Sequence, residues 1–306
     1  MRKFWGLTKR NLLLFFKDKQ MIFFSLLTSI IVLALYLLFL KGTFIDAIKS
    51  GIEQYPGLST LISDSETDMF ANLFLLTGII GSALITVPYN CLLTLVRDRE
   101  NKIDYDILST PVKRGQIILS YFSASAISSV ILTGIILSIG LGVIRLQGDF
   151  YMDPVQILKT YGIVALGSVS ATAFFMIIVM FFKSTGASAA FLGILSAAAG
   201  FIIGAYIPIS EFSDGVQTVC NLFPASQITI ILRNMLMNGL LDHMNESIGG
   251  DDDGMFVQGL KDTFTFDARL FEKSYDTKQM LIFVIAMIFV CLALQVAVFS
   301  RTYKKK

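Results

Sequence analysis

The chain has 306 residues, of which 54% are hydrophobic and 16% are charged, and its mean hydropathy is +0.69. Soluble domains carry about 25% charged residues, so this composition excludes an ordinary soluble protein and indicates an integral membrane protein. The formal net charge of +2 gives no sign of a nucleic-acid partner. The three cysteines show no paired spacing, which argues against a disulfide framework and against a zinc site.

The N-terminal residues 1–20 have the pattern of a helix that lies on the membrane surface. Lys3, Arg10 and Lys17 recur every seven residues and fall on one face, while Trp5 belongs to an apolar face opposite. An interfacial helix of this kind places its basic side against anionic lipid head groups. The alternative is a positive flank that only fixes the orientation of the first span.

Six apolar segments follow, each long enough to cross a hydrocarbon core of about 30 Å. We therefore predict an all-α, polytopic membrane protein that forms a single transmembrane domain over residues 1–306. The six predicted transmembrane helices occupy residues 21–40, 72–95, 117–144, 160–182, 188–208 and 279–300.

The basic residues near the ends of the spans predict the orientation. If the spans alternate, the N-terminal segment, the polar stretch 97–116, Lys183 and the tail 301–306 lie on one side, which holds most of the Lys and Arg residues. Such an excess marks the cytoplasmic side. We therefore expect a multi-pass protein of the cell (plasma) membrane with both termini cytoplasmic.

The polar stretch 97–116 interrupts the apolar runs and contains an amphipathic helix. Ile103, Ile107 and Leu108 fall on one side of it, and Thr110-Pro111 ends it because proline lacks an amide donor. A short helix of mixed charge with an apolar edge suits a groove on a soluble partner. A solvated loop helix without a partner is the alternative.

The opposite side of the membrane receives residues 209–278, which divide into two parts. Residues 209–241 are apolar enough for a pair of short helices, bent at Phe223 and Pro224, that dip back into the outer leaflet as a re-entrant pair. Residues 242–278 are polar and acidic, with the run Asp251–Asp253, and we expect them to form an outer lobe.

The spans contain no Asp, Glu, Lys, Arg or His in their interiors, whereas ion-coupled carriers usually place such groups at membrane depth. The chain also has no phosphate-binding loop of the Gly-x-x-x-x-Gly-Lys type. We find no catalytic constellation and no metal site, and we interpret the single histidine, His243, as a surface residue. If the protein moves a substrate uphill, the energy comes from a separate chain.

Two stripes of small or neutral polar residues have two interpretations each. Ser82, Thr86 and Asn90 share a face of the second span and either line a pathway or bond to other helices and to carbonyls of their own helix. Ser196, Gly200 and Gly204 in the fifth span either meet a second subunit or pack within the chain.

These features together resemble the permease subunits of type-2 ABC exporters. The resemblance rests on the basic N-terminal helix, the six spans, the segment Leu108–Arg114 (LSTPVKR), Tyr206–Pro208 (YIP) and Phe223–Ser226 (FPAS). In that family, the segment at 97–116 is the coupling helix, which docks on the ATPase subunit. Lys102 and Asp106 differ from the small and apolar residues usual at these positions. The resemblance assigns docking to Arg97, Asp98, Arg99, Glu100, Asp104, Tyr105, Leu108, Thr110 and Pro111.

The resemblance implies a dimer with an identical or homologous permease, bound to cytoplasmic ABC ATPase subunits that hold ATP and Mg. This chain would itself carry no cofactor. The uncharged spans suit an amphipathic or lipid-like substrate, such as a drug or a peptide antibiotic. The alternative is a sensory or scaffold membrane protein that binds a ligand or partner through its acidic outer lobe, and an ion-coupled carrier is disfavoured.

Overall fold

The computed structural model describes residues 2–53, 62–147, 151–248, 254–271 and 273–302, and almost all of its regular structure is helical. One short antiparallel hairpin pairs Ala268 with Tyr275 and Leu270 with Lys273. The elements are α1 (Arg2–Lys17), α2 (Lys19–Leu35), η1 (Tyr36–Leu40), α3 (Lys41–Glu53), α4 (Asp64–Glu100), α5 (Ile103–Ser109), α6 (Arg114–Gln147), α7 (Pro154–Val179), α8 (Thr185–Ile202), η3 (Ile209–Glu211), α9 (Asp214–Leu222), α10 (Pro224–Ile248), α11 (Met255–Thr263), β1 (Ala268–Leu270), β2 (Lys273–Tyr275) and α12 (Thr277–Thr302).

Within these ranges, 6 helices are long and apolar enough to cross a membrane, so the prediction of six spans is confirmed. They are Lys19–Ser50, Asp64–Glu100, Arg114–Gln147, Pro154–Val179, Thr185–Ile202 and Thr277–Phe299. The fifth ends at Ile202 rather than at residue 208, because Gly204 adopts a φ of +66° that a helix cannot continue. The amides of Ala205 and Tyr206 then turn back to the carbonyl of Gly200.

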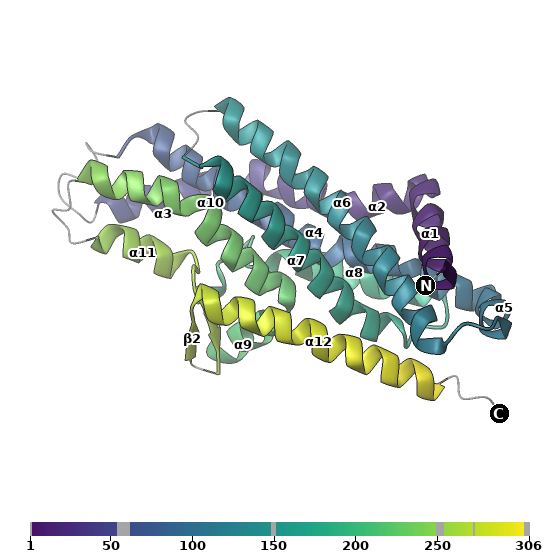
Figure 1. The fold of residues 1–306 in the computed structure, drawn as a ribbon. Coiled ribbons are helices and arrows are strands. Elements are labelled where there is room, and N and C mark those ends of the chain that lie inside the picture. Colours follow the sequence, from purple (N-terminus) through teal and green to yellow (C-terminus); the bar gives the residue numbers. More distant parts are fainter. Residues whose placement is uncertain (1, 54–61, 148–150, 249–253, 272, 303–306) are drawn as a thin grey trace.

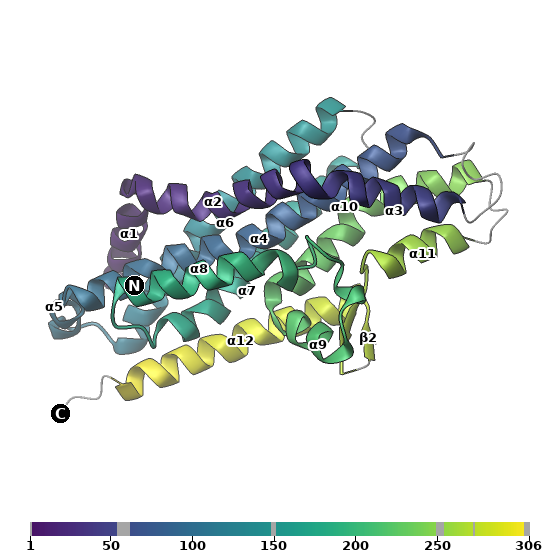
Figure 2. The ribbon, with the colours of Figure 1, turned by 180° about the vertical axis from the view of Figure 1, so that it is seen from behind.

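The helices form an elongated bundle with α4 at its centre (Figure 1). In its apolar window, 83% of the α4 residues are buried, against 22% for both α8 and α12. The helix α5, the start of α1 and the end of α12 lie at one end of the bundle, and α3 and α11 lie at the other (Figures 1 and 2). The central helix therefore connects the two ends and contacts most of the other spans.

The predicted bend at Phe223 and Pro224 is confirmed. Helices α9 and α10 meet at 94° on either side of Phe223, and Pro224 begins α10, where the missing amide of proline costs no hydrogen bond. Helix α10 is longer than we expected, because it continues past residue 241 to Ile248 and packs beside α4 and α7. Re-entry into the outer leaflet stays a prediction.

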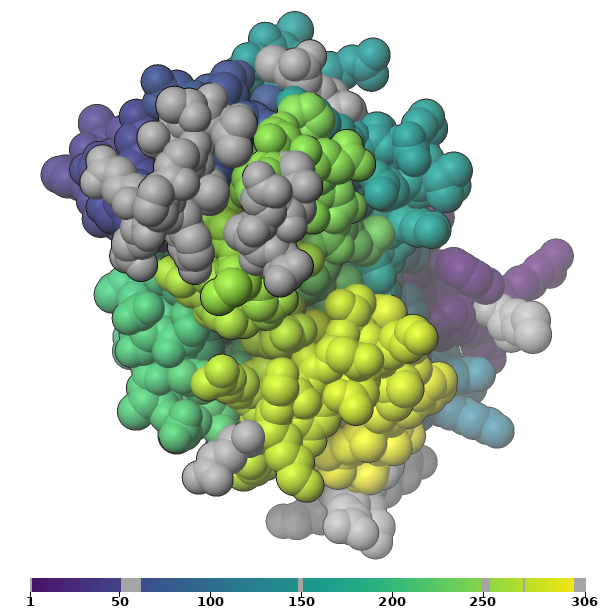
Figure 3. Space-filling model, turned by 90° about the vertical axis from the view of Figure 1, so that its left-hand side faces the viewer, coloured from purple at the N-terminus to yellow at the C-terminus, as the bar shows by residue number. Residues whose placement is uncertain are grey.

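The end of the bundle opposite α5 is closed by aromatic side chains. Phe264 contacts Phe70, Phe74 and Phe44 edge-on or tilted, with ring centroids 5.1, 5.3 and 5.8 Å apart, and Phe44 also stacks on Tyr36. In the predicted outer lobe 242–278, the described residues form the end of α10, α11, the hairpin and the start of α12, which share this end with α3 (Figure 3). The acidic run 251–253 lies outside the described residues.

His243 lies on the surface, as we expected, but it also has a partner within the chain. Its side chain is 44% exposed, but Nδ1 lies 2.9 Å from Oε1 of Glu66, and the ring packs against Tyr151. Glu66 in turn accepts hydrogen bonds from the amide and hydroxyl of Ser63 at the start of α4. The histidine therefore links α10 to the first turn of α4.

Candidate functional site

The short helix α5 lies between the ends of α4 and α6, at one extremity of the bundle (Figure 1). It begins after Lys102, whose φ of 61° reverses the chain direction, and it ends at Ser109, before Thr110 and Pro111. Ile107 is buried, and Ile103 and Leu108 pack against the core, so the predicted amphipathic pattern is confirmed. Tyr105 points away from the bundle and is 66% exposed.

The last residues of α4, Arg97 to Glu100, each contact a different part of the chain, and we call them the linking segment. Arg97 Nη1 lies 2.8 Å from Oδ2 of Asp18, which stands between α1 and α2. Asp18 also accepts hydrogen bonds from the amides of Gln20 and Met21 and so caps α2. Partial burial alone would raise the pKa of Asp18, but the hydrogen bonds from Arg97 and the amides outweigh it, and the pKa is lowered.

Asp98 connects α4 with α1 and α6. Its side chain is 4% exposed and accepts hydrogen bonds from Arg10 of α1, with Nη2 3.0 Å from Oδ1, and from the hydroxyl of Tyr121 of α6. The hydrogen bond to Asp98 raises the pKa of Arg10, against an opposing effect of burial. A carboxylate buried at this depth needs a cation and further donors. Arg10 and Tyr121 supply both.

Arg99 and Glu100 connect α4 with the turn between α7 and α8. Arg99 Nη1 donates to the carbonyls of Met180 and Phe182, at 2.6 and 2.8 Å, just after α7 ends. Glu100 Oε2 accepts from the amide and hydroxyl of Thr185, where α8 begins. A cation at a helix C-terminus and a carboxylate at a helix N-terminus both complement the backbone groups left unpaired there.

The docking residues assigned from the resemblance thus fall into two sets. One set, Arg97, Asp98, Arg99 and Glu100, has side chains that contact other parts of the same chain. In or just after α5, Tyr105, Thr110 and Pro111 are exposed, and Asp104 and Leu108 are partly buried. Docking itself stays a prediction, in which the exposed set would take part without breaking the contacts of the first set.

The basic residues predicted to face lipid on the N-terminal helix α1 include two that contact other parts of the chain. Arg10 points to Asp98 rather than to lipid head groups, because the buried carboxylate requires a cation. Lys3 Nζ lies 3.4 Å from the carbonyl oxygen of Pro111 and so reaches the turn after α5. Trp5, which is 60% exposed, and Lys17 remain on the surface, as an interfacial helix requires.

The neutral stripe on α4 is buried within the chain. Ser82 and Asn90 are 0% and 3% exposed, and Thr86 is 0% exposed. Ser82 donates to the carbonyl of Ile79, Thr86 to that of Ser82 and Asn90 to that of Thr86, all on α4 itself. These contacts correspond to the alternative interpretation of the stripe, in which the side chains bond to their own helix.

Two of the three residues predicted for a subunit interface pack inside the chain. A Cβ atom on Gly200 would lie 2.2 Å from Cε2 of Tyr206, and one on Gly204 would lie 2.8 Å from Cγ1 of Ile209. Ser196 is partly buried. The interface prediction for Gly200 and Gly204 is therefore corrected to internal packing, because the turn after α8 folds back onto this face.

Arg233 is a residue that our reading of the sequence missed. It is 0% exposed on α10, and its guanidinium donates to the carbonyls of Ile203, Gly204, Phe264 and Thr265 at 2.7–3.2 Å. It also lies 4.4 Å from the ring centroid of Phe74. A single basic residue inside the apolar run Ile228–Leu241 was the available signal.

Metal ligation finds no support in the described ranges, where no group of three His, Cys, Asp or Glu side chains could hold an ion. Cys91, Cys220 and Cys291 are free and buried. The features of the site are thus helix-to-helix contacts and one exposed short helix.

Comparison with protein families gives one match. The family described as ABC-2 family transporter protein matches residues 45–300, which is most of the chain and includes α4, α5 and α6. No curated protein sequence matches the chain.

Proposed function

The chain belongs to the ABC-2 transporter family and is a multi-pass membrane permease that itself lacks ATPase activity; we propose that it serves an exporter of an amphipathic or lipid-like substrate. Permeases of this family pair with ABC ATPase subunits. In the proposal, those subunits are cytoplasmic, hold ATP and Mg, and bind at α5. A second permease chain, identical or homologous, completes the transporter, and both termini of this chain are cytoplasmic.

The exposed edge of α5 is the proposed docking surface. Ile107 anchors the helix in the core, which leaves Tyr105 and Asp106 on the outer side and Thr110 and Pro111 at the end. Tyrosine is common among the residues that contribute most to protein interfaces, because it buries a large ring without burying its hydroxyl unpaired. Tyr105 is therefore the proposed anchor for the ATPase.

The linking segment is the observation on which the proposal rests. A force applied to α5 acts on the end of α4. From there, Arg97 contacts the junction of α1 and α2, and Asp98 contacts α1 and α6. Arg99 contacts the end of α7, and Glu100 contacts the start of α8. Coupling between distant sites requires such contiguous contacts. The helices that would open a route for the substrate are in this way tied to the docking surface.

Apolar side chains exposed on the spans support the proposed substrate class. They include Phe39 of η1, Ile139 of α6 and Phe289 of α12, which are 70%, 64% and 69% exposed. A strongly hydrated ion would gain nothing from such surfaces, whereas an amphipathic or lipid-like molecule would.

Copurification tests the proposal. The full-length chain is isolated from its native membrane together with the ABC ATPase that accompanies it, and Tyr105→Ala is compared with Phe271→Ala, an aromatic residue on the hairpin that is 74% exposed. We expect Tyr105→Ala to lower the recovered ATPase about tenfold, the effect of about 1.4 kcal/mol of binding free energy, and Phe271→Ala to leave it unchanged. Equal recovery with both variants would show that the ATPase binds elsewhere.

A further inference from the structure

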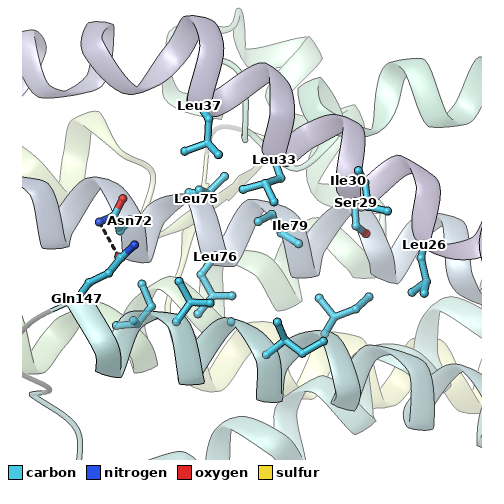
Figure 4. A pocket seen from close by; sticks show the side chains of 15 residues that line it. Leu26, Ser29, Ile30, Leu33, Leu37, Asn72, Leu75, Leu76, Ile79 and Gln147 are labelled. Atoms are coloured by element: carbon cyan, nitrogen blue, oxygen red, sulfur yellow. Dashed lines mark hydrogen bonds between the residues drawn. The ribbon is translucent and has the colours of Figure 1, made fainter.

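A groove of about 470 Å³ lies between α2, α4 and α6 (Figure 4). Leu33 of α2 and Leu37 of η1 form one wall. Leu76 and Ile79 of α4 form the floor, and Ile139 and Val143 of α6 form the other wall. Leu37 and Ile139 are 56% and 64% exposed, so the groove is open along its side.

The groove exists because α6 packs closely on α4 while α2 stands apart from α6. Gly140 permits this approach, since a Cβ atom at that position would lie 2.1 Å from Cδ1 of Leu76. Helix α2 packs on α4 instead. The space between α2 and α6 is therefore open to the surroundings of the protein.

The polar groups of the groove gather at one end. Asn72 Nδ2 donates to Oε1 of Gln147 at 3.0 Å, and one helical turn farther along α4 the carboxylate of Asp68 pairs with Lys41 at 3.2 Å. Along the rest of the groove, the lining is apolar except for Ser29. Ser29 is 6% exposed, and its buried hydroxyl has no partner among the described residues.

The length of the groove matches one leaflet of a bilayer. Its lining on α2 and η1 extends over Leu26–Leu37, and eleven helical steps correspond to about 16 Å. Half of a hydrocarbon core of about 30 Å is about 15 Å. Because the groove lies within three spans, its apolar part faces hydrocarbon, and Asn72 and Gln147 lie where head groups begin.

We propose that this groove binds the alkyl chain of a membrane phospholipid from the leaflet opposite α5, with the head group beside Asn72 and Gln147. The occupant follows from the geometry: an apolar channel of one leaflet's length, open to the bilayer and polar only at its outer end, fits an acyl chain and its head group. The site does not involve α5, so it stands apart from the docking of the ATPase.

Tryptophan fluorescence tests the proposal, because Trp5 is the single tryptophan of the chain. In a Trp5→Phe background, Leu37→Trp reports on the groove, and Phe289→Trp on α12, which is 69% exposed, reports on general lipid contact. The full-length protein is purified in detergent with phosphatidylcholine brominated on its acyl chains, which quenches nearby tryptophan. We expect that, on dilution with detergent, the groove reporter stays quenched at about a tenfold lower lipid concentration than the α12 reporter.

A filled groove provides the second variant. With Leu37→Trp as the reporter, the double substitution Ile139→Phe and Val143→Phe should raise the lipid concentration for half quenching about tenfold, while Ile282→Phe on α12 should not change it. Parallel recovery of both reporters would overturn the proposal, since it would indicate only the general lipid shell. A groove reporter that bromine never quenches would also overturn it and would indicate a second copy of the chain in the groove. Recovery of the ATPase with the same variants tests the proposed function separately.

Discussion

The two ends of the bundle are held together by different chemistry. At the α5 end, paired charges join α4 to its neighbours, and several of them are partly exposed: the side chains of Arg97 and Arg10 are 50% and 31% accessible. At the opposite end, a buried guanidinium, Arg233, binds backbone carbonyls and lies over the ring of Phe74, which packs edge-on against Phe264. Partly exposed ion pairs are weak and can be exchanged at low cost, whereas a buried network is costly to open. The α5 end is therefore suited to move and the other end to stay fixed.

Arg233→Met should have the largest effect on stability. The substitution leaves the carbonyls of Ile203, Gly204, Phe264 and Thr265 without their donor, and each unsatisfied buried group costs about 1–3 kcal/mol. We expect the free energy of unfolding to fall by at least about 3 kcal/mol, measured by thermal or denaturant unfolding in detergent.

Arg145→Met is the matched control, because Arg145 is an exposed arginine near the end of α6. It should change the free energy of unfolding by no more than about 0.5 kcal/mol. If Arg233→Met were equally mild, the opposite end of the bundle would not depend on the guanidinium, and the contrast between the two ends would fail.

Asp98→Asn should rank second. The amide that replaces the carboxylate loses the charge that holds Arg10 and one acceptor for Tyr121, and hydrogen bonds to charged groups contribute about 1.5–3 kcal/mol. Arg10 keeps contact with water, so we expect a loss of about 2 kcal/mol. Asp106→Asn on the exposed side of α5 is the control, and the double variant with Arg10→Met should lose less than the sum of the single changes.

The contrast between the ends also separates the features that the sequence predicts from those that only the packing of the helices determines. Hydropathy predicted the spans, because an α-helix in lipid must satisfy its own backbone and therefore needs a long apolar run. The amphipathic spacing of Ile103, Ile107 and Leu108 likewise predicted α5, and proline predicted its end. These features depend on residues close together in the chain.

The partners of the charged residues could not be predicted in the same way. Arg10 and Asp98 are 88 positions apart, and Arg233 binds carbonyls about 30 positions away, so only the packing of the helices brings them together. A charged stretch next to water looks the same whether it binds another protein or its own helices. The linking segment was for that reason assigned entirely to docking.

Arg99→Met should separate linking from docking. It removes the donor to the carbonyls of Met180 and Phe182 but leaves the exposed edge of α5 intact. We expect the ATPase to copurify as with the unaltered chain, while the free energy of unfolding falls by about 1–2 kcal/mol and substrate-stimulated ATP hydrolysis decreases. Tyr105→Ala should instead lower copurification and leave the free energy of unfolding unchanged. Loss of copurification with Arg99→Met would place Arg99 at the docking surface.

Gly204→Ala should weaken the fixed end by a smaller amount. Alanine at a φ of +66° costs about 1–2 kcal/mol, and its Cβ would press on Ile209, close to the guanidinium of Arg233. Gly193→Ala, inside the preceding helix α8, has open space and a helical backbone, so it should leave stability unchanged or raise it by about 0.5–1 kcal/mol. Equal destabilisation by both would contradict the internal packing of Gly204.

Acid should weaken the contact between Asp18 and Arg97, with the smallest effect. Burial opposes ionisation of Asp18, but the hydrogen bonds from Arg97 and the α2 amides outweigh it and hold the pKa of Asp18 in the folded protein below its ordinary value. A lowered acid pKa contributes stability that is present above the unfolded pKa and is lost as the pH falls through the folded pKa. Between pH 7 and pH 5 the contribution of Asp18 should therefore be constant, and it should decline below about pH 4. The difference in melting temperature between the unaltered chain and Asp18→Asn, followed over this range, measures it. A difference that already disappears at pH 6 would mean that another group, and not Asp18, carries the pH dependence at the α5 end.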